Sequence, residues 1–451
     1  MERTDLPMLT RPIRWSAATA AFQIEGARHA DGRGRCIWDD WVDTEGKVID
    51  GSTADPGPDS YHRWAEDVAL AAGLGLDRYR FSLSWVRVMP DGRTVNPVGL
   101  DYYSRLVDAL LEAGVTPFPT LYHWDLPVGF EAQGGWLSRD TAYRFAEYAA
   151  VVAEHLGDRV AHWYTVNEPA MTTLQGYGIG DLAPGRLMLF DALPTVHHQL
   201  LGHGLAARAL RAAGAAEVGL ANNHTRVLTA LQTEADRAAA DAYDVLHNRL
   251  FADPVLLGTY PDLSPFGALE MPVQGDDLEI ISTAPDFYAI NFYNPTTVGA
   301  PPADSPIPFD LLPTPGAPVT GFGPEWPILP DALRDLLLDF TARYRDVLPP
   351  LIISENGASF PEPDTAGPVD DADRIGYLDG HLRAVAEAID GGADVAEYTV
   401  WSLLDNFEWA DGYRQRFGLV HVDFADGTRT PKASYDWYRR VIAAHRGGQA
   451  R

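Results

Sequence analysis

Two glutamates in the sequence stand where short apolar segments end. The first, Glu355, closes the run at residues 351–357, in which three large aliphatic side chains come before the carboxylate and Gly357 lets the chain turn away. A run this short and this apolar is typical of a central parallel strand that is covered on both faces. We therefore expect Glu355 at the carboxyl end of a buried strand, the edge at which parallel α/β folds hold ligands and chemistry.

The second glutamate, Glu168, follows a segment of the same kind. Residues 161–169 are aromatic and β-branched, and they end in a polar pair before a helix-breaking proline. A single glutamate in such a place would be interpreted as a cap of the following loop. Two strands that each bring a glutamate to one rim favour a catalytic pair, because glycoside hydrolysis uses one carboxyl group as proton donor and a second as nucleophile or base.

The elements that must position these glutamates alternate along the chain. Strands are expected within residues 13–26, 76–82, 115–124, 161–169, 217–223, 287–293, 351–357 and 395–401. Helices are expected at residues 60–73, 99–113, 138–156, 190–213, 234–249, 330–347 and 372–390, with a last helix that begins at Pro431. Alternation of this kind predicts a parallel sheet. Eight units in 451 residues favour an α/β fold with one closed (β/α)₈ barrel, long loops after its strands, and a single domain over residues 1–451.

Two of the connections carry expectations of their own. Residues 31–58 are rich in turns and are predicted to be too polar for a core element. Residues 299–327 form a long insertion rich in proline and glycine, which is typical of a wall or lid of a site. The glycine-rich stretch at 176–180 follows no predicted strand and lacks the spacing of a dinucleotide-binding turn, so a nucleotide site is not favoured.

Composition excludes several classes of function. A formal net charge of −28, from 35 basic and 63 acidic residues, repels nucleic acid and anionic lipid. Cys36 is the one cysteine, so neither an intramolecular disulfide nor a cysteine-based zinc site is expected. His197, His198 and His203 lie on an Ala/Leu-rich helix with no acidic residue between them, which favours packing over a metal site.

Residues 1–15 contain no apolar signal region and no stretch is long enough to span a bilayer, so we expect a cytoplasmic protein without a membrane partner.

Six short motifs occur in the chain. They are ATAAFQIEG at 18–26, YRFS at 79–82, HWDLP at 123–127, TVNEP at 165–169, ISENG at 353–357 and WSLLDNFEW at 401–409. With these motifs in this order, the sequence resembles family 1 of the glycoside hydrolases, the β-glucosidase family, over nearly its whole length. It departs from the family pattern at Ser16, Phe22, Cys36 and Ser354, where Gly, Tyr, Ser and Thr are usual. None of these changes alters a group that is expected to touch sugar.

The resemblance implies a retaining enzyme that acts on β anomers without a cofactor. Glu168 would be the acid/base and Glu355 the nucleophile, with their carboxyl groups roughly 5 to 5.5 Å apart. At that separation the charge of Glu355 raises the pKa of Glu168, which begins protonated and later, once Glu355 is esterified, deprotonates the incoming water. Arg80 and Tyr293 are expected against Glu355, and Asn167 is expected on the sugar 2-hydroxyl.

The substrate would be held through its edges and its faces. A hexopyranose has hydroxyl groups around its edge that need polar partners, and C–H faces that pack on aromatic rings. The residues expected to bind the sugar are Gln23, His123, Trp124, Asn291, Trp401, Glu408, Trp409 and Phe417. Asn223 and Trp326 are expected on the aglycone side.

The expected function is hydrolysis of terminal non-reducing β-D-glucosyl residues of a small glycoside or oligosaccharide by double displacement. Galactosyl and fucosyl residues stay open, because residue types alone do not rank sugar epimers. A 6-phospho-β-glycosidase is not favoured, since the carboxylate of Glu408 would repel a phosphate dianion. A barrel that binds carbohydrate without turnover is not favoured either, because Glu168, Glu355 and Arg80 are all present. The sequence does not indicate an oligomeric state.

Overall fold

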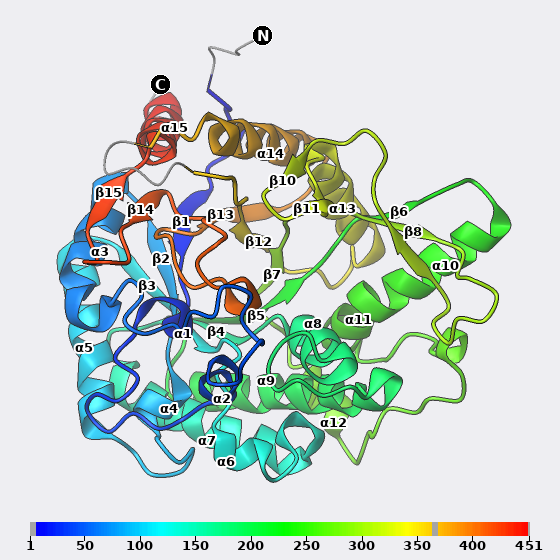
Figure 1. Ribbon diagram of the computed structural model, residues 1–451, viewed down its shortest axis with the longest axis horizontal. Coiled ribbons are helices and arrows are strands. Elements are labelled where there is room, and N and C mark those ends of the chain that lie inside the picture. The colour runs from blue at the N-terminus through cyan, green and yellow to red at the C-terminus, as the bar shows by residue number, and fades with distance from the viewer. Residues whose placement is uncertain (1–5, 363–368, 450–451) are drawn as a thin grey trace.

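Eight parallel strands close into a barrel at the centre of the computed structural model, which describes residues 6–362 and 369–449 (Figure 1). The first five residues of the N-terminal stretch that was expected to lack a signal region lie outside the described residues. The barrel strands are β1 (Arg14–Ala18), β2 (Arg78–Ser82), β3 (Thr116–Tyr122), β4 (His162–Asn167), β5 (Glu217–Asn223), β7 (Phe287–Asn291), β12 (Leu351–Asn356) and β13 (Val395–Trp401). Strand β1 pairs with both β2 and β13, and this closes the ring. The predicted (β/α)₈ barrel is confirmed.

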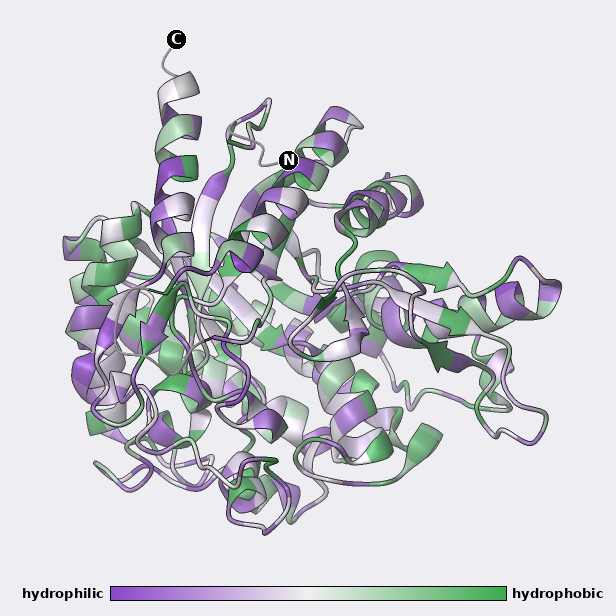
Figure 2. Cartoon of the chain, turned by 45° about the horizontal axis from the view of Figure 1, so that its top comes forward, coloured by the Kyte–Doolittle hydropathy of each residue, from purple (hydrophilic) through white to green (hydrophobic). Residues whose placement is uncertain are grey.

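Helices surround the barrel, and the principal ones follow the predicted pattern (Figure 1). They are α3 (Ser60–Leu74), α5 (Pro97–Glu112), α7 (Arg139–Leu156), α9 (Pro194–Ala212), α10 (Glu234–Asp244), α11 (Leu250–Leu257), α13 (Pro330–Arg343), α14 (Ala372–Asp390) and α15 (Ala433–Gln449). Short helices are α1 (Ala21–Ile24), α2 (Ile37–Val42), α4 (Trp85–Val88), α6 (Val128–Glu131), α8 (Pro169–Met171) and α12 (Asp277–Ile281). Hydrophobic and hydrophilic residues are interspersed on the outer helices (Figure 2), and most of these helices pack an apolar side on the core, whereas α10 packs on β8. Among the described residues, no helix is both long enough and apolar enough for a membrane crossing.

The interior of the barrel is filled by side chains in layers. The middle layer is apolar and contains Phe118, Tyr164, Ala221, Phe287, Ala289 and Ile352. On one side of it the guanidinium of Arg78 lies 4.6 Å from the ring centre of Phe118, and on the other side the guanidinium of Arg80 lies 4.7 Å from that of Tyr164. Since β2 runs from Arg78 to Ser82, Arg78 marks the amino end of the barrel and Arg80 its carboxyl end. The core is packed rather than open, as in other barrels of this size.

Two local predictions were wrong. Residues 31–58 contain α2, which buries Ile37, Trp38 and Trp41. The polar composition misled because the buried carboxylate of Asp39 is neutralised by arginines that come earlier in the chain, at 2.9 Å from Arg28 and 2.8 Å from Arg33.

The last helix does not begin at Pro431. That proline ends β15 (Arg429–Pro431), which pairs antiparallel with β14 (Val420–Val422), and α15 starts two residues later. Proline is compatible with an edge strand as well as with a first helical turn, so its presence alone did not decide between them.

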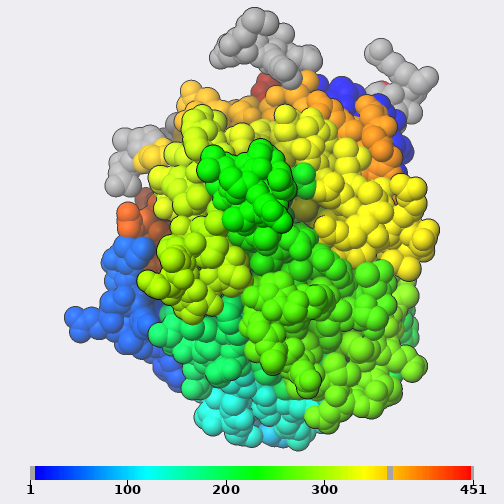
Figure 3. All heavy atoms as spheres, turned by 90° about the vertical axis from the view of Figure 1, so that its right-hand side faces the viewer, coloured from blue at the N-terminus to red at the C-terminus, as the bar shows by residue number. Residues whose placement is uncertain are grey.

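The insertion at 299–327 is built from short strands rather than from loop alone. It contains β9 (Asp310–Leu312), β10 (Val319–Thr320) and β11 (Gly323–Pro327), and β9 joins β6 (Val227–Thr229) and β8 (Thr296–Gly299) in a small sheet. Figure 3 faces the side of the molecule on which this insertion, α10 and α13 lie next to one another. The insertion therefore stands beside the carboxyl ends of β5 and β7.

Candidate active site

The two glutamates lie at the same end of the barrel. Glu355 is the fifth of the six residues of β12, and Glu168 comes directly after the last residue of β4. Because the strands of the barrel are parallel, the carboxyl ends of β4 and β12 open onto one rim. Both side chains are buried, with 3% of Glu355 and 4% of Glu168 exposed.

Glu355 is held by one cation and one hydroxyl group. Its Oε1 accepts a hydrogen bond of 2.6 Å from Nη1 of Arg80, and its Oε2 accepts one of 2.6 Å from the hydroxyl of Tyr293. The same guanidinium donates to the carbonyl oxygen of Ser354 at 2.9 Å and to Oδ1 of Asn167 at 2.6 Å. These bonds fix both oxygens of Glu355 and supply a compensating positive charge.

Arg80 is itself supported by residues that the sequence analysis did not single out. Its Nε donates to the hydroxyl of Thr120 at 3.2 Å, and its guanidinium lies over the ring of Tyr164. A signal was available for Tyr164, since it lies in the aromatic strand that leads directly to Glu168. Nothing in the sequence marked Thr120 in the same way.

Glu168 has different partners. Its Oε1 accepts two hydrogen bonds from side-chain amides, at 2.8 Å from Nδ2 of Asn291 and at 3.0 Å from Nδ2 of Asn223. Burial, together with the negative charge of Glu355, raises the pKa of Glu168 to about 8, although the two amides and Arg80 pull it down. Glu168 is therefore protonated at neutral pH and can act as an acid.

A short series of hydrogen bonds links the two carboxyl groups. Arg80, which binds Glu355, also binds Asn167, and Oδ1 of Asn167 accepts a bond of 3.1 Å from the Asn291 amide that binds Glu168. The structure thus brings together the predicted residues Glu355, Arg80, Asn167, Asn291 and Glu168. The arrangement combines a proton donor with a second, oriented carboxylate.

Aromatic rings form a group on one side of the glutamates. The ring of His123 stacks on Trp401, with centroids 5.9 Å apart, and on Trp409, at 6.0 Å. Trp124 lies 4.6 Å from Trp409, and its indole donates to the carbonyl oxygen of Asn167 at 3.0 Å. Burial and the charge of Arg80 lower the pKa of His123 well below its usual range, so the imidazole is neutral.

Gln23 and Glu408 supply polar atoms next to these rings. The amide of Gln23, in α1, donates to the carbonyl oxygen of Phe407 at 2.8 Å and reaches Glu408 at 3.4 Å. Its buried Oε1 has no partner among the described residues and is free to accept from a ligand hydroxyl. Burial, followed by the charges of Asp411, Glu355 and Glu168, raises the pKa of Glu408 well above its usual range.

The insertion at 299–327 brings Trp326 to the site. The ring of Trp326, in β11, lies 5.3 Å from that of Tyr293 and stacks on Phe322 at 4.3 Å. Phe417 packs with these rings and with Trp401 in one apolar cluster. The insertion thus forms one side of the site, as a wall would.

Candidate metal ligands elsewhere are engaged by other groups. Ligand atoms of Glu362, Asp405 and His421 lie within 4.8 Å of one another. The ammonium of Lys432 pairs with Glu362 and lies 2.8 Å from Asp405, so the charge that would attract a metal ion is already compensated. Of the histidines on α9, His197 forms hydrogen bonds of 2.9 Å with both Tyr260 and Asp277. It thus connects α9 to neighbouring segments, a structural role of the kind that was expected for it.

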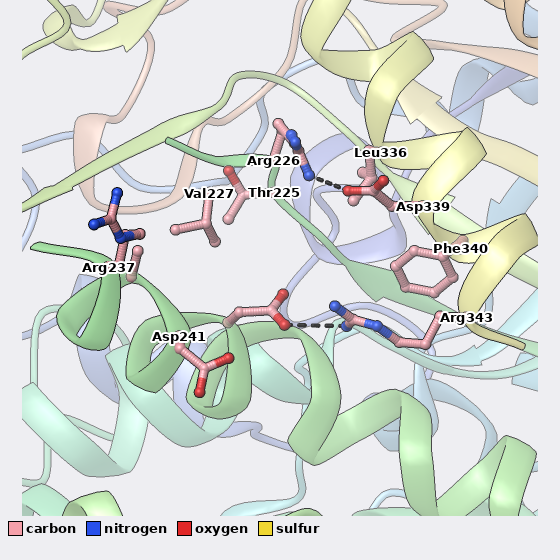
Figure 4. A pocket seen from close by; sticks show the side chains of 11 residues that line it. Thr225, Arg226, Val227, Arg237, Asp241, Leu336, Asp339, Phe340 and Arg343 are labelled. Atoms are coloured by element: carbon pink, nitrogen blue, oxygen red, sulfur yellow. Dashed lines mark hydrogen bonds and ion pairs between the residues drawn. The ribbon is translucent and has the colours of Figure 1, made fainter. Parts of the chain in front are cut away.

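A cavity of about 260 Å³ lies outside the barrel, between α10, α13 and the segment that follows β5 (Figure 4). Its lining contains three arginines and three aspartates, but none of the glutamates described above. Arg226 pairs with Asp339 across it, and Arg343 pairs with Asp244 at 3.0 Å. The charges of these four side chains are thus paired with one another.

Comparisons with known proteins agree with this geometry. The family model described as glycosyl hydrolase family 1 matches residues 9–447. The thermostable beta-glucosidase B of Thermobispora bispora is 47% identical over 442 residues, which cover 95% of this chain and 89% of the relative. The bifunctional beta-D-glucosidase/beta-D-fucosidase of Bifidobacterium breve is 42% identical over 465 residues, covering 96% and 97%.

Solved structures give the same result. The psychrophilic beta-glucosidase BglU of Micrococcus antarcticus superposes with a TM-score of 0.92 at 46% identity, covering 96% of this chain and 97% of that one. The family 1 b-glucosidase of Thermotoga maritima superposes with a TM-score of 0.93 at 38% identity, covering 98% and 99%. The resemblance therefore extends over the barrel and its loops together.

Proposed function

The chain belongs to glycosyl hydrolase family 1, and we propose that it is a β-glucosidase that removes terminal non-reducing β-D-glucosyl residues with retention of configuration. The observation that carries the proposal is the contrast between its two central carboxyl groups. Glu355 is bound by Arg80 and Tyr293, whereas Glu168 is bound by two neutral amides and has its pKa raised to about 8. One glutamate is thus suited to attack as a carboxylate and the other to donate a proton.

In the first step a carboxylate oxygen of Glu355 attacks the anomeric carbon. The bond from that carbon to the leaving oxygen breaks, and the proton of Glu168 passes to the leaving oxygen. The product is a glycosyl ester on Glu355, which carries no charge. The negative charge that helped to raise the pKa of Glu168 is then absent, and Glu168 is a carboxylate.

In the second step a water molecule attacks the same carbon from the side that the aglycone left. Glu168 takes a proton from that water, the ester bond breaks, and Glu355 regains its charge. Two inversions give net retention. The guanidinium of Arg80 and the hydroxyl of Tyr293 stabilise the leaving carboxylate of Glu355.

Asn167 is proposed to bind the sugar 2-hydroxyl. Its Oδ1 is occupied by Arg80 and Asn291, and one N–H donates to Nε2 of His123 at 3.1 Å. The second N–H of the amide is left for a ligand oxygen. Hydrogen bonds to the 2-hydroxyl of the sugar strengthen towards the oxocarbenium-like transition state.

The remaining predicted residues are proposed to bind the sugar ring and the aglycone. The free Oε1 of Gln23 and the carboxyl of Glu408 would hold hydroxyl groups, and Trp401 and Trp409 would cover a C–H face of the ring. A glucosyl group is proposed because the relatives described above are named beta-glucosidases, and a fucosyl group is the second candidate because one of them is also named a beta-D-fucosidase. We propose that residues 1–451 form one catalytic domain.

The experiment is a panel of aryl β-glycosides that carry glucose, galactose, fucose or 6-phosphoglucose. NMR then records the anomeric configuration of the sugar at the moment it is released, before the anomers equilibrate. We expect the glucoside to turn over, the first sugar to appear as the β anomer, and the 6-phosphoglucoside to be inert, because the charged Glu355 repels a phosphate dianion and the carboxyl group of Glu408 offers it no cation. Release of the α anomer, or turnover of none of the four glycosides, would contradict the proposal. A 2-deoxy-2-fluoro glucoside should label Glu355, and a label on another residue would overturn its assignment.

A further inference from the structure

A histidine outside the barrel strands is bonded to the group that binds Glu168. Nε2 of His247 lies 3.0 Å from Oδ1 of Asn223, and Nδ2 of the same asparagine donates to Oε1 of Glu168 at 3.0 Å. His247 belongs to the π-helical turn Val245–Arg249, which directly follows α10. Turns of this kind are frequent at functional sites. Neither its spacing nor its surroundings in the sequence marked this residue.

The hydrogen bonds of His247 determine which ring nitrogen carries its proton. Burial lowers the pKa of the imidazole to about 4, so it is neutral and has one N–H donor. Since the amide nitrogen of Asn223 is turned towards Glu168, its oxygen faces His247 and needs a donor. The proton is therefore on Nε2, and Nδ1 is left to accept from the hydroxyl of Tyr243 at 3.4 Å.

The effect on Glu168 is to make its two oxygens unequal. Oε1 accepts from Asn223 and from Asn291, while Oε2 accepts no hydrogen bond from any residue in 6–362 or 369–449. The amide of Asn291 is fixed in the same manner, because the hydroxyl of Ser354 donates to its Oδ1 at 2.6 Å. Two N–H groups that point at Oε1 exclude the acidic proton from that oxygen and leave it on Oε2.

We propose that His247 is a positioning residue for the acid/base of this enzyme: by donating to Asn223 it keeps the amide turned towards Glu168, and so keeps the catalytic proton on Oε2, where the glycosidic oxygen can receive it. The inference rests on the proposed function, since it concerns the proton that Glu168 delivers. It assigns a role in catalysis to a side chain that does not touch the substrate.

The surroundings of His247 hold the imidazole in place. Its ring stacks on Tyr243 at 5.4 Å with an angle of 20° between the planes, and 8% of the residue is exposed. The charged and titratable groups that face it are Asp244, which is paired with Arg343, and the neutral His224. Those that face Glu168 are Glu355, Arg80, Glu408 and Tyr293. Replacement of His247 by a neutral residue therefore changes no net charge near Glu168 at neutral pH.

Loss of the donor at position 247 has a defined chemical consequence. With its oxygen unpaired, Asn223 can turn over and present Oδ1 to Glu168, which favours a proton on Oε1. The acid then points at the amide instead of the leaving oxygen, and its ionised form loses one hydrogen bond. Substrates that need protonation of the leaving group should be affected most, and the pKa of Glu168 should rise.

The test compares His247→Leu, which removes the donor, with His247→Gln, whose amide N–H can take the place of Nε2. His224→Gln is the matched control, because His224 is also a buried neutral histidine but bonds to Asn248 at 3.1 Å and to Tyr288 at 2.9 Å instead of Asn223. Each variant is assayed on an alkyl β-glucoside, a poor leaving group, and on 2,4-dinitrophenyl β-glucoside, an activated one. Rates are expressed per active site titrated with a 2-deoxy-2-fluoro glucoside, so that a lower yield of folded protein does not enter.

We expect His247→Leu to lower kcat/KM on the alkyl glucoside about 10-fold or more and to spare the activated one. The basic limb of its profile of kcat/KM against pH should move to higher pH. His247→Gln should restore both the rate on the alkyl glucoside and the position of this limb, and His224→Gln should change neither.

Should the leucine variant not fold, Asn223→Ala removes the same bond to Glu168 and should show the same dependence on the leaving group. Equal losses on both substrates, or an unmoved pH limb, would overturn the inference while wild-type activity stands. A wild type that hydrolyses neither glucoside would instead overturn the proposed function, and the inference with it.

Discussion

The two ends of the barrel interior contain the same types of charged residue in different proportions. At the amino end, Arg78 lies between Glu217 at 2.7 Å and Glu397 at 3.0 Å, and His162 adds a bond of 3.0 Å to Glu217. At the carboxyl end, Arg80 is the one cation among residues 6–362 and 369–449 that pairs with Glu355, while Glu168 and Glu408 are bound by amides.

This difference in pairing separates a structural cluster from a reactive one. Bonds from His162 and Arg78 lower the pKa of Glu217 to about 2, so it stays a carboxylate. Burial and unbalanced negative charge raise the pKa of Glu168 to about 8. One glutamate is fixed in its charged state, and the other can exchange a proton near neutral pH. Burial also raises the pKa of Glu397, although Arg78 pulls it down, so the contrast lies between Glu168 and Glu217 and not between all carboxyl groups of the two ends.

The backbone shows the same contrast. Trp124, Glu168 and Trp409, all at the carboxyl end, have φ of 76°, 47° and 48°, in the left-handed region that side chains other than glycine rarely adopt. None of the described residues of β2, β4, β5 or β13 near Arg78 has such a φ. Strain of this kind costs about 1 kcal/mol or more at each residue and is concentrated at functional sites. Among the described residues, Ala27, Asp31, Asp59 and Leu189 share such a φ away from the barrel strands, so the contrast holds between the two ends of the barrel and not for the fold as a whole.

The strongest test of the comparison removes one glutamate from each end. Glu355→Ala should lower kcat by at least ~10⁴-fold on every β-glucoside, since it removes the group proposed to attack the anomeric carbon. Glu397→Ala leaves Arg78 with one partner fewer in a buried position, and should destabilise the fold by about 3 kcal/mol while kcat per titrated active site is unchanged. Steady-state kinetics and urea unfolding measure the two effects. A Glu397 variant that lost catalysis in its folded fraction would show that the two ends do not act separately.

The next largest effect concerns the proton. Glu168→Ala should lower kcat/KM by about 10²- to 10⁴-fold on glucosides with poor leaving groups, the range that general acid catalysis supplies. Activated aryl glucosides should still form the glycosyl ester, and azide should then speed its breakdown and yield a glucosyl azide. Stopped-flow kinetics with and without azide separates the two steps. Equal losses on both kinds of substrate, with no response to azide, would exclude Glu168 as the acid/base.

The sequence was sufficient for the strands that carry these residues. Apolar runs such as residues 351–357 and 161–169 predicted where β12 and β4 end, and the ends of parallel strands meet in space, so Glu355 and Glu168 could be expected on one rim. The helix at 372–390 was predicted with the bounds that α14 has, because its apolar spacing is regular and glycines follow it.

What the sequence could not provide were contacts between distant segments. The amide of Asn291 reaches Glu168 across 123 residues, and His247 reaches Asn223 from a turn that does not belong to a barrel strand. Residues 31–58 were misjudged for another reason, because Arg28 and Arg33 are near Asp39 in sequence but composition does not show that they pair with it. Local pattern predicts elements well, but the protonation of a side chain depends on its neighbours in space.

The smallest predicted effect is on stability, and its sign differs between Glu168 at the carboxyl end and Glu217 at the amino end. The pKa of Glu168 is raised from about 4.5 to about 8, so between these values the folded protein keeps a proton that the unfolded chain releases, and stability falls as the pH rises. Glu168→Gln removes this dependence and should stabilise the protein by roughly 1 to 3 kcal/mol at pH 8.5, with little effect below pH 4.5.

The pKa of Glu217 is lowered to about 2, so its stabilising contribution is complete above about pH 4.5 and is lost as the pH falls. Glu217→Gln should accordingly lower the Tm at neutral pH and have less effect in acid. Thermal unfolding of both variants from pH 4 to pH 9 should therefore give differences from the wild type of opposite sign at neutral pH, and two differences of the same sign would mean that Glu168 and Glu217 do not differ in the way their hydrogen-bond partners indicate.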